Sequence, residues 1–160
     1  MNFYHIILLI FILCGCGSSN KDLDYIQTLY SDRNIVFDDE TEFCIVLPEV
    51  GCSGCISGIL YDVLDNKASF SNNQKKNLIV FTAVNSKKML RRNIQVDSLD
   101  ELNCIVDTEN RFLLDTKDKI YPIIMTLDNG RITNVMIQSP DNPEDAFAIL
   151  FDDDEKSDSI

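Results

Sequence analysis

The feature that most constrains the fold is a pair of cysteines placed between a run typical of a strand and a run typical of a helix. Residues 43–47 read FCIVL, an unbroken apolar stretch of the kind found in strands covered on both faces. A proline and a glycine end this stretch, and residues 53–65 then place apolar side chains at helical spacing. Cys52 and Cys55 stand at the junction, so the sequence predicts a C-x-x-C motif at the first turn of a helix.

This placement has a chemical consequence. A thiol in the first turn of a helix lies near unpaired backbone N–H groups and the positive end of the helix dipole, which favour the thiolate. Cys52 would occupy that end and be exposed, and Cys55, three residues on, would lie within reach for a disulfide. One thiolate can attack a substrate disulfide while the other resolves the mixed intermediate. We therefore expect Cys52 to be the nucleophile and Cys55 the resolving thiol.

Hydrophobic periodicity predicts alternating helices and strands on both sides of this motif. The further predicted helices cover residues 21–32, 86–94 and 142–151, and the further predicted strands cover residues 34–37, 78–84, 104–107, 121–127 and 131–138. The last two strands flank Asn129 and Gly130, a residue pair favoured in tight hairpin turns. The pattern indicates one α/β domain without internal repeats.

Taken together, these elements resemble the thioredoxin-like superfamily over about residues 43–151. The order strand, C-x-x-C, helix, strand, helix, then an X-Pro that opens a hairpin before a last helix is similar to its membrane-anchored extracytoplasmic members, lipoproteins of the Bacteroidetes type. The resemblance implies a three-layer α/β sandwich with a mixed central sheet, flanking helices, and a C-terminal β-hairpin plus helix. It also implies that Pro122 matches the family's cis-proline, which faces the dithiol and positions the substrate backbone.

The motif departs from thioredoxin itself. It reads CSGC, without the proline or the preceding tryptophan, and Val46 stands where thioredoxin keeps a buried proton-shuttling aspartate. Glu49 lies nearer in the chain and could take that role. An alternative for Pro122 is an ordinary edge-strand proline.

Cys44 and Cys104 stand in apolar stretches, where a free cysteine behaves as a small buried hydrophobe. A four-thiolate zinc site would need both of them in addition to the C-x-x-C motif. A structural bridge between the two is another option, but the family's strand order implies that their strands are not neighbours and that both thiols are free. The resemblance implies neither a bound cofactor nor a metal.

The N-terminus predicts export. Residues 6–13 form an apolar run that is too short to span a bilayer, which takes about 20 residues, and small residues follow it at once. Residues 13–16, LCGC, resemble a bacterial lipobox, which implies that residues 1–15 are a lipoprotein signal peptide and that Cys16 is lipidated. A buried apolar strand or helix is the alternative. The remaining expected parts are a tether at residues 16–20, the thioredoxin-like domain at 21–151 and an acidic disordered tail at 152–160.

Charge and histidine content exclude several function classes. The net charge of −12 would repel a phosphate backbone, so we expect no nucleic-acid partner. The single histidine, His5, lies inside the predicted signal, which excludes an imidazole base from the mature protein. A peroxidase is a lesser option, because its P-x-x-x-T/S-x-x-C context is absent.

The sequence thus predicts a monomeric thiol–disulfide oxidoreductase of the cell envelope. A lipid would anchor it to the outer membrane or to the periplasmic face of a membrane. Its partners would be protein thiol or disulfide substrates and a partner that resets its redox state. The alternative is a redox-inactive lipoprotein in which a structural disulfide between Cys52 and Cys55 supports a binding module.

Overall fold

The computed structural model of the 160-residue chain describes residues 21–65, 76–86, 88, 90 and 103–140. The predicted signal peptide, lipidation site, tether, last helix and acidic tail lie outside the described residues. None of the helices in the described part combines the length and the apolar character that a membrane span requires.

The core of the protein is a mixed five-stranded sheet. Its strand order is β3-β2-β1-β4-β5, with β1–β3 mutually parallel and β4 antiparallel to both of its neighbours. The strands are β1 (Thr41–Pro48), β2 (Lys76–Thr82), β3 (Cys104–Val106), β4 (Ile123–Asp128) and β5 (Arg131–Ile137). The short β3 therefore forms one edge of the sheet and β5 forms the other.

Strand β1 occupies the centre of the sheet, as its unbroken apolar run predicts. Cys44 and Val46 point into a hydrophobic cluster on one face, whereas Ile45 and Leu47 point into a second cluster on the other face. All four are at most 1% exposed. This alternation follows from the two-residue period of a strand, and it explains why the run must be apolar at every position.

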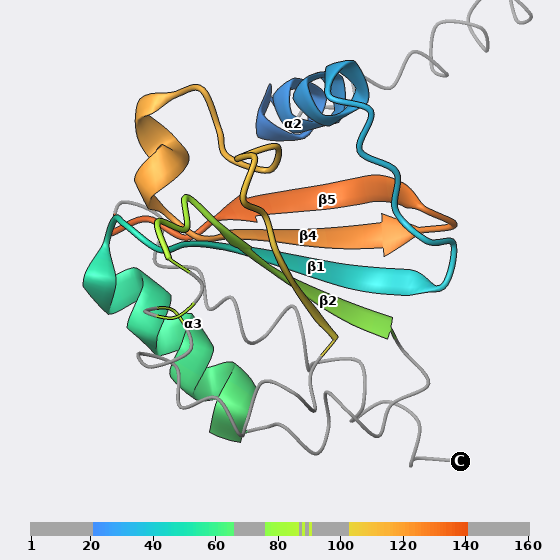
Figure 1. The fold of residues 1–160 in the computed structure, drawn as a ribbon. Helices are drawn as coiled ribbons and strands as arrows, with labels where there is room; N and C mark the ends of the chain where they lie inside the picture. The colour runs from blue at the N-terminus through green and yellow to red at the C-terminus, as the bar shows by residue number, and fades with distance from the viewer. Residues whose placement is uncertain (1–20, 66–75, 87, 89, 91–102, 141–160) are drawn as a thin grey trace, which may run out of the picture.

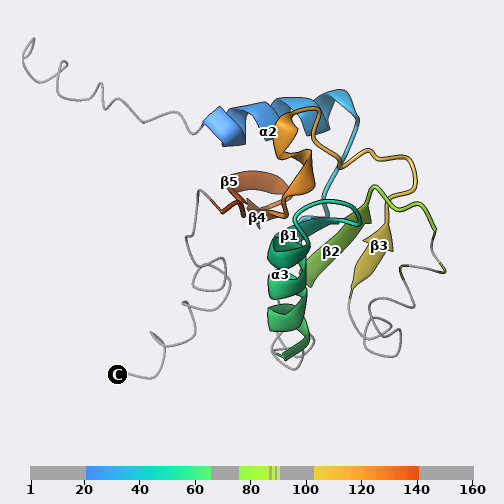
Figure 2. The same ribbon diagram turned by 90° about the vertical axis from the view of Figure 1, so that its left-hand side faces the viewer.

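Two helices cover the opposite faces of the sheet, as Figures 1 and 2 show. Helix α2 (Lys21–Asp32) buries Ile26 and Tyr30 in the cluster that contains Cys44, and helix α3 (Ser53–Asp65) buries Ile59 and Val63 in the other cluster. Both helices match their predicted bounds. The structure thereby confirms the predicted α/β three-layer arrangement.

The β4–β5 hairpin is also confirmed, and its turn shows why the sequence is Asn-Gly. Asn129 has a φ of 49° and Gly130 a φ of 74°, the left-handed conformations that a two-residue hairpin turn needs. A side chain at Gly130 would also be crowded, because its Cβ would lie 2.9 Å from the Asp39 carboxylate and 3.0 Å from the Phe37 carbonyl oxygen.

Some predicted bounds were wrong. Residues 34–37 form no strand, because Asn34 turns the chain at a φ of 53° and Arg111 binds the carbonyl oxygens of Arg33 and Asn34. Strand β2 ends at Thr82, two residues early, because Ala83 has a φ of 56°. The predicted helix at 86–94 is described only near its start, where the Leu90 N–H donates to the Ser86 carbonyl over 3.0 Å.

Candidate active site

Cys52 is the N-cap residue of helix α3. Its carbonyl accepts the first helical hydrogen bond, from the N–H of Ile56 over 3.0 Å, while its sulfur accepts from the N–H of Cys55 over 3.4 Å. Serine and aspartate usually supply the side-chain acceptor at an N-cap, and here a sulfur takes that place. The first turn of α3 contains no acidic residue, so the positive end of the helix dipole is not neutralised there. This environment stabilises negative charge on the Cys52 sulfur when the pair is reduced.

Cys52 and Cys55 form a disulfide in the structure, with their Cα atoms 5.3 Å apart. Both residues are partly exposed to solvent. Two apolar side chains nearby are open to solvent as well: Val50 is 61% exposed and Ile120 is 38% exposed. The C-x-x-C spacing and the helix start predicted for the motif are thus present, while Cys52, which was predicted to be exposed, is partly buried.

A short 3₁₀ helix, η2 (Lys117–Ile120), contacts the C-x-x-C motif through its last residue. The Ile120 carbonyl at its end accepts a hydrogen bond from the Cys52 N–H over 2.9 Å. Gly51 makes this contact feasible, because a Cβ there would overlap the carbonyl group of Ile120. In Figure 1, η2 and the start of α3 lie at the same end of the sheet.

The loop that leads into the motif is fixed to the end of β2. The Glu49 N–H donates to the Thr82 carbonyl over 2.8 Å, and the Glu49 carboxylate accepts from the Asn85 N–H over 2.6 Å. The Thr82 hydroxyl in turn donates to the buried Asp107 carboxylate over 2.9 Å. Glu49 thus has a structural role in holding this loop. Val46, which stands where thioredoxin keeps a buried aspartate, is 1% exposed within an apolar cluster.

Pro122 lies near the site but differs from its predicted geometry. No cis peptide bond occurs among the described residues, so the Tyr121–Pro122 bond is trans and the predicted cis bond is wrong. The trans isomer is the ordinary state of an X-Pro bond, and Tyr121 has the extended conformation that a residue before proline favours. The edge-strand reading is not supported either, because Pro122 is buried just before β4, an interior strand.

The two other described cysteines lie apart from the C-x-x-C motif and from each other. Cys44 is buried in the cluster between α2 and the sheet, whereas Cys104 packs against the cluster between α3 and the sheet. Strand β2 separates their two strands. Both are free thiols, as predicted. No group of three or more potential metal-ligating side chains gathers anywhere in the described part of the chain.

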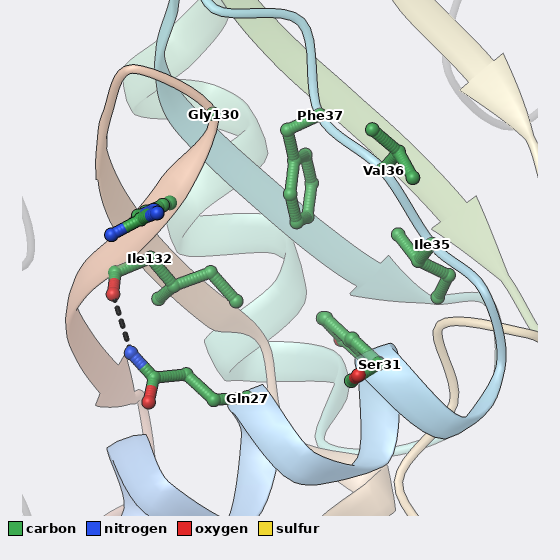
Figure 3. Close-up of a pocket in the computed structure, with 9 residues that line it drawn as sticks. Gln27, Ser31, Ile35, Val36, Phe37, Gly130 and Ile132 are labelled. Carbon is green, nitrogen blue, oxygen red and sulfur yellow. Dashed lines mark hydrogen bonds between the residues drawn. The ribbon is translucent and has the colours of Figure 1, made fainter.

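A separate pocket of about 550 Å³ is lined by residues of α2, of the segment after it and of the β4–β5 turn. Figure 3 shows the side chains of Phe37 and Ile132 pointing into this pocket. The Gln27 side chain donates to the Ile132 carbonyl over 2.7 Å. Neither a cysteine nor a carboxylate is among the nine residues that line it. None of these nine residues belongs to the C-x-x-C motif or to η2.

Sequence analysis missed the residues that hold the dithiol from outside the motif. Ile120 and Gly51 meet only in the folded chain, and residues 108–120 carry no hydrophobic period that would mark them. One local signal was available: Thr116 precedes η2, and its side chain accepts from the Asp118 N–H over 3.3 Å, an N-cap pattern.

Comparison with known proteins agrees with this architecture. No family model and no curated protein matches the chain in sequence. Among solved structures, it is similar to the solution structure of a protein from Neisseria meningitidis that carries the provisional name thioredoxin, with a TM-score of 0.50 and 17% sequence identity. The match covers 75% of this chain and 80% of the other. The chain therefore has a thioredoxin-like fold with a disulfide-bonded C-x-x-C pair at the start of its α3 helix.

Proposed function

We propose that this protein is a thiol–disulfide oxidoreductase of the cell envelope. The observation that carries the proposal is the disulfide at the N-cap of α3, where Cys52 is partly exposed and its sulfur accepts a backbone hydrogen bond. A bridge between residues three apart closes a very short loop and stabilises the fold little by chain entropy. Reversible exchange is therefore a better account of this bond than stapling.

The exchange reaction balances within the dithiol and its substrate. In the reducing direction, the Cys52 thiolate attacks one sulfur of a substrate disulfide, which forms a mixed disulfide and releases one substrate thiolate. The Cys55 thiolate then attacks the Cys52 sulfur, releases the second substrate thiolate and restores the Cys52–Cys55 bond. The substrate gains two electrons and the protein loses two. The oxidising direction is the reverse, and no bound cofactor takes part.

Polypeptide substrates suit this site. Val50, two residues before Cys52, and Ile120, whose carbonyl accepts from the Cys52 N–H, are exposed apolar residues that a polypeptide could contact. Pro122, two residues beyond Ile120, is the proposed substrate-positioning residue. A thiol or disulfide partner of matching potential would reset the pair after each turnover.

The proposed location follows from the N-terminal sequence. The apolar residues 6–13 and the LCGC segment support removal of a signal and lipidation of Cys16. The protein would then act as a monomer on the outer membrane or on the periplasmic face of a membrane. An oxidising compartment of this kind is where disulfide chemistry operates.

The first experiment measures the reduction potential of the Cys52–Cys55 pair. The full chain is equilibrated with glutathione or dithiothreitol buffers, and modified thiols are counted by mass spectrometry. We expect a potential between about −270 and −120 mV, the range of redox-active dithiols. A potential below about −300 mV would mark a structural bridge and support the redox-inactive binding lipoprotein instead.

A matched pair of variants tests the roles of the thiols. Cys52→Ser should abolish exchange with a protein disulfide, because no other described thiol lies at a helix N-cap. Cys104→Ser removes a half-buried free thiol and should leave the rate unchanged. A Cys52→Ser protein that retained the native rate would refute the mechanism.

A further inference from the structure

The parallel strands β1, β2 and β3 end at the same edge of the sheet, and the chain enters the C-x-x-C motif from that edge. Thr82 is the last residue of β2, and its carbonyl accepts from the Glu49 N–H over 2.8 Å. The Thr82 hydroxyl donates to the Asp107 carboxylate over 2.9 Å. Glu49 directly follows β1, and Asp107 directly follows β3. Thr82 therefore joins the continuation of β3 to the loop that carries Cys52.

The Asp107 carboxylate is buried, with only 8% of the residue exposed. The Phe112 N–H donates over 2.8 Å to Oδ2, the same oxygen that accepts from Thr82. Within the described residues Asp107 takes part in no ion pair, because the ion pair found there joins Arg33 to Asp115. A buried carboxylate is costly unless it is paired and hydrogen-bonded, and an apolar side chain in its place can leave stability unchanged. Stability of the fold alone therefore gives little reason for a carboxylate at this position.

The residue after β2 has a conformation that is unfavourable for a side chain. Ala83 has a φ of 56°, and its N–H donates to the Asn110 side-chain oxygen over 3.0 Å. Left-handed residues other than glycine are uncommon, and they collect near functional sites whose surroundings hold them in place. Two residues on, the Asn85 N–H donates to the Glu49 carboxylate over 2.6 Å. The turn after β2 thus holds Glu49 by its side chain, while Thr82 holds it by its backbone.

The two groups that donate to Asp107 also line one small interior space. Thr82 and Phe112 share this space with Pro48, the last residue of β1, and with Tyr121, which directly follows η2. The contacts of Asp107 are therefore packed against the ends of both segments that reach the C-x-x-C motif.

We propose that Asp107 is a positioning residue for Cys52 and acts through Thr82 and Glu49. The inference rests on the proposed exchange activity. In the reduced protein, the Cys52 thiolate is stabilised while its sulfur stays near the N–H groups of the first turn of α3. Asp107 fixes the loop that holds Cys52 there. It accepts hydrogen bonds and touches no reacting sulfur, and the electron transfer is unchanged: the substrate disulfide gains two electrons from the dithiol.

Two matched pairs of variants test this link. Thr82→Val removes the hydroxyl at the same shape, whereas Thr82→Ser keeps a hydroxyl. Asp107→Leu removes the acceptor, whereas Asp107→Asn keeps one oxygen that can accept both hydrogen bonds. Ile132→Ala is the control for general loss of stability, because Ile132 is buried on β5 and pairs with Leu127, away from the end of the hairpin that begins next to Pro122.

Two quantities are measured on full chains that urea denaturation shows to be folded. The first is the second-order rate constant of the reduced protein with 2-hydroxyethyl disulfide at pH 7. The second is hydrogen exchange at the Glu49 amide of the oxidised protein. Thr82→Val and Asp107→Leu should lower the rate constant by about two- to five-fold, the range for stabilisation of a charge at a helix terminus. Both should accelerate exchange at the Glu49 amide.

Thr82→Ser and Asp107→Asn should restore most of the rate, and Ile132→Ala should react like the native protein although it is less stable. A native rate in both Thr82→Val and Asp107→Leu would overturn the proposed role, as would an equal loss of rate in Ile132→Ala or in Asp107→Asn. Should Asp107→Leu fail to fold, the comparison of Thr82→Val with Thr82→Ser decides. A native protein that does not react with 2-hydroxyethyl disulfide would instead refute the exchange activity itself, and the role of Asp107 with it.

Discussion

At the scale of single residues, the site depends on positions where little space is left. Gly51 allows the loop before Cys52 to touch the backbone of Ile120, and the Cys52 N–H completes the contact. By contrast, Gly54 in the first turn of α3 has open space where a Cβ would stand. The two glycines lie on either side of Cys52 and have opposite requirements.

This contrast predicts opposite effects of the same substitution. Gly51→Ala should destabilise the protein by about 1–3 kcal/mol, because the new methyl group must push η2 away from the motif. Gly54→Ala should stabilise it by up to about 1 kcal/mol, because alanine is the better helix former. Urea denaturation of the oxidised proteins measures both. Equal stability of the two variants would show that Gly51 has room to spare.

At the scale of elements, the dithiol is held by a segment that α2 fixes in place. Arg33, just after α2, donates to the carbonyls of Arg111 and Leu113 and forms a bidentate ion pair with Asp115 over 2.7 Å. The same segment continues into η2 and ends at the Ile120 carbonyl. Helix α2 thus supports the candidate active site from the far face of the sheet, although it contributes no residue to the motif.

Removing this support should loosen the segment. Arg33→Met keeps the aliphatic part of the side chain but leaves two carbonyls and a carboxylate without their donor, so we expect a loss of about 1–3 kcal/mol in the free energy of unfolding. Hydrogen exchange at residues 113–120 should accelerate more than in the β4–β5 hairpin. Arg131→Met is the control, and it should stay within about 0.5 kcal/mol of the native stability. Unchanged exchange at 113–120 would count against the role of Arg33.

At the scale of the whole molecule, the core buries two groups that titrate at alkaline pH. Burial raises the pKa of the Cys44 thiol above its ordinary value of 9.0, and burial likewise raises the pKa of the Tyr30 hydroxyl above 10.0. Tyr30 also donates to the Phe112 carbonyl over 3.0 Å. Both groups therefore stay neutral in the folded protein while they ionise in the unfolded chain.

The stability should accordingly fall as pH rises above about 9. A raised folded-state pKa gives stability that is complete below the unfolded pKa and is lost above it, because only the unfolded chain releases the proton. Each such group contributes a slope of about 1.4 kcal/mol per pH unit. Urea denaturation between pH 8 and pH 10 should show a shallower fall for Cys44→Ala than for the native protein. Parallel slopes would mean that the thiol ionises in the folded state.

Much of this structure could be predicted because its signals are local. The bounds of α2 and α3, the apolar run of β1 and the Asn129-Gly130 turn each depend on a few consecutive residues. The mistakes arose where distant contacts decide. Arg111 binds the backbone carbonyls just after α2, and the Ile120 carbonyl reaches Cys52 from 68 positions later in the chain. Neither contact leaves a pattern in the sequence near it.

The strand order has a consequence for how the protein reaches its native state. The β4–β5 hairpin joins neighbouring residues through a two-residue turn, and hairpins of this kind form in about 1–10 μs. The pairing of β1 with β4, in contrast, joins Ile45 to Ile124 and closes a loop that contains β2, α3 and β3. Closing such a loop costs chain entropy before its contacts form, which makes the pairing a slow step. Cys52 and Cys55 are only three residues apart in the chain. During folding they can therefore meet well before η2 is in place to hold them.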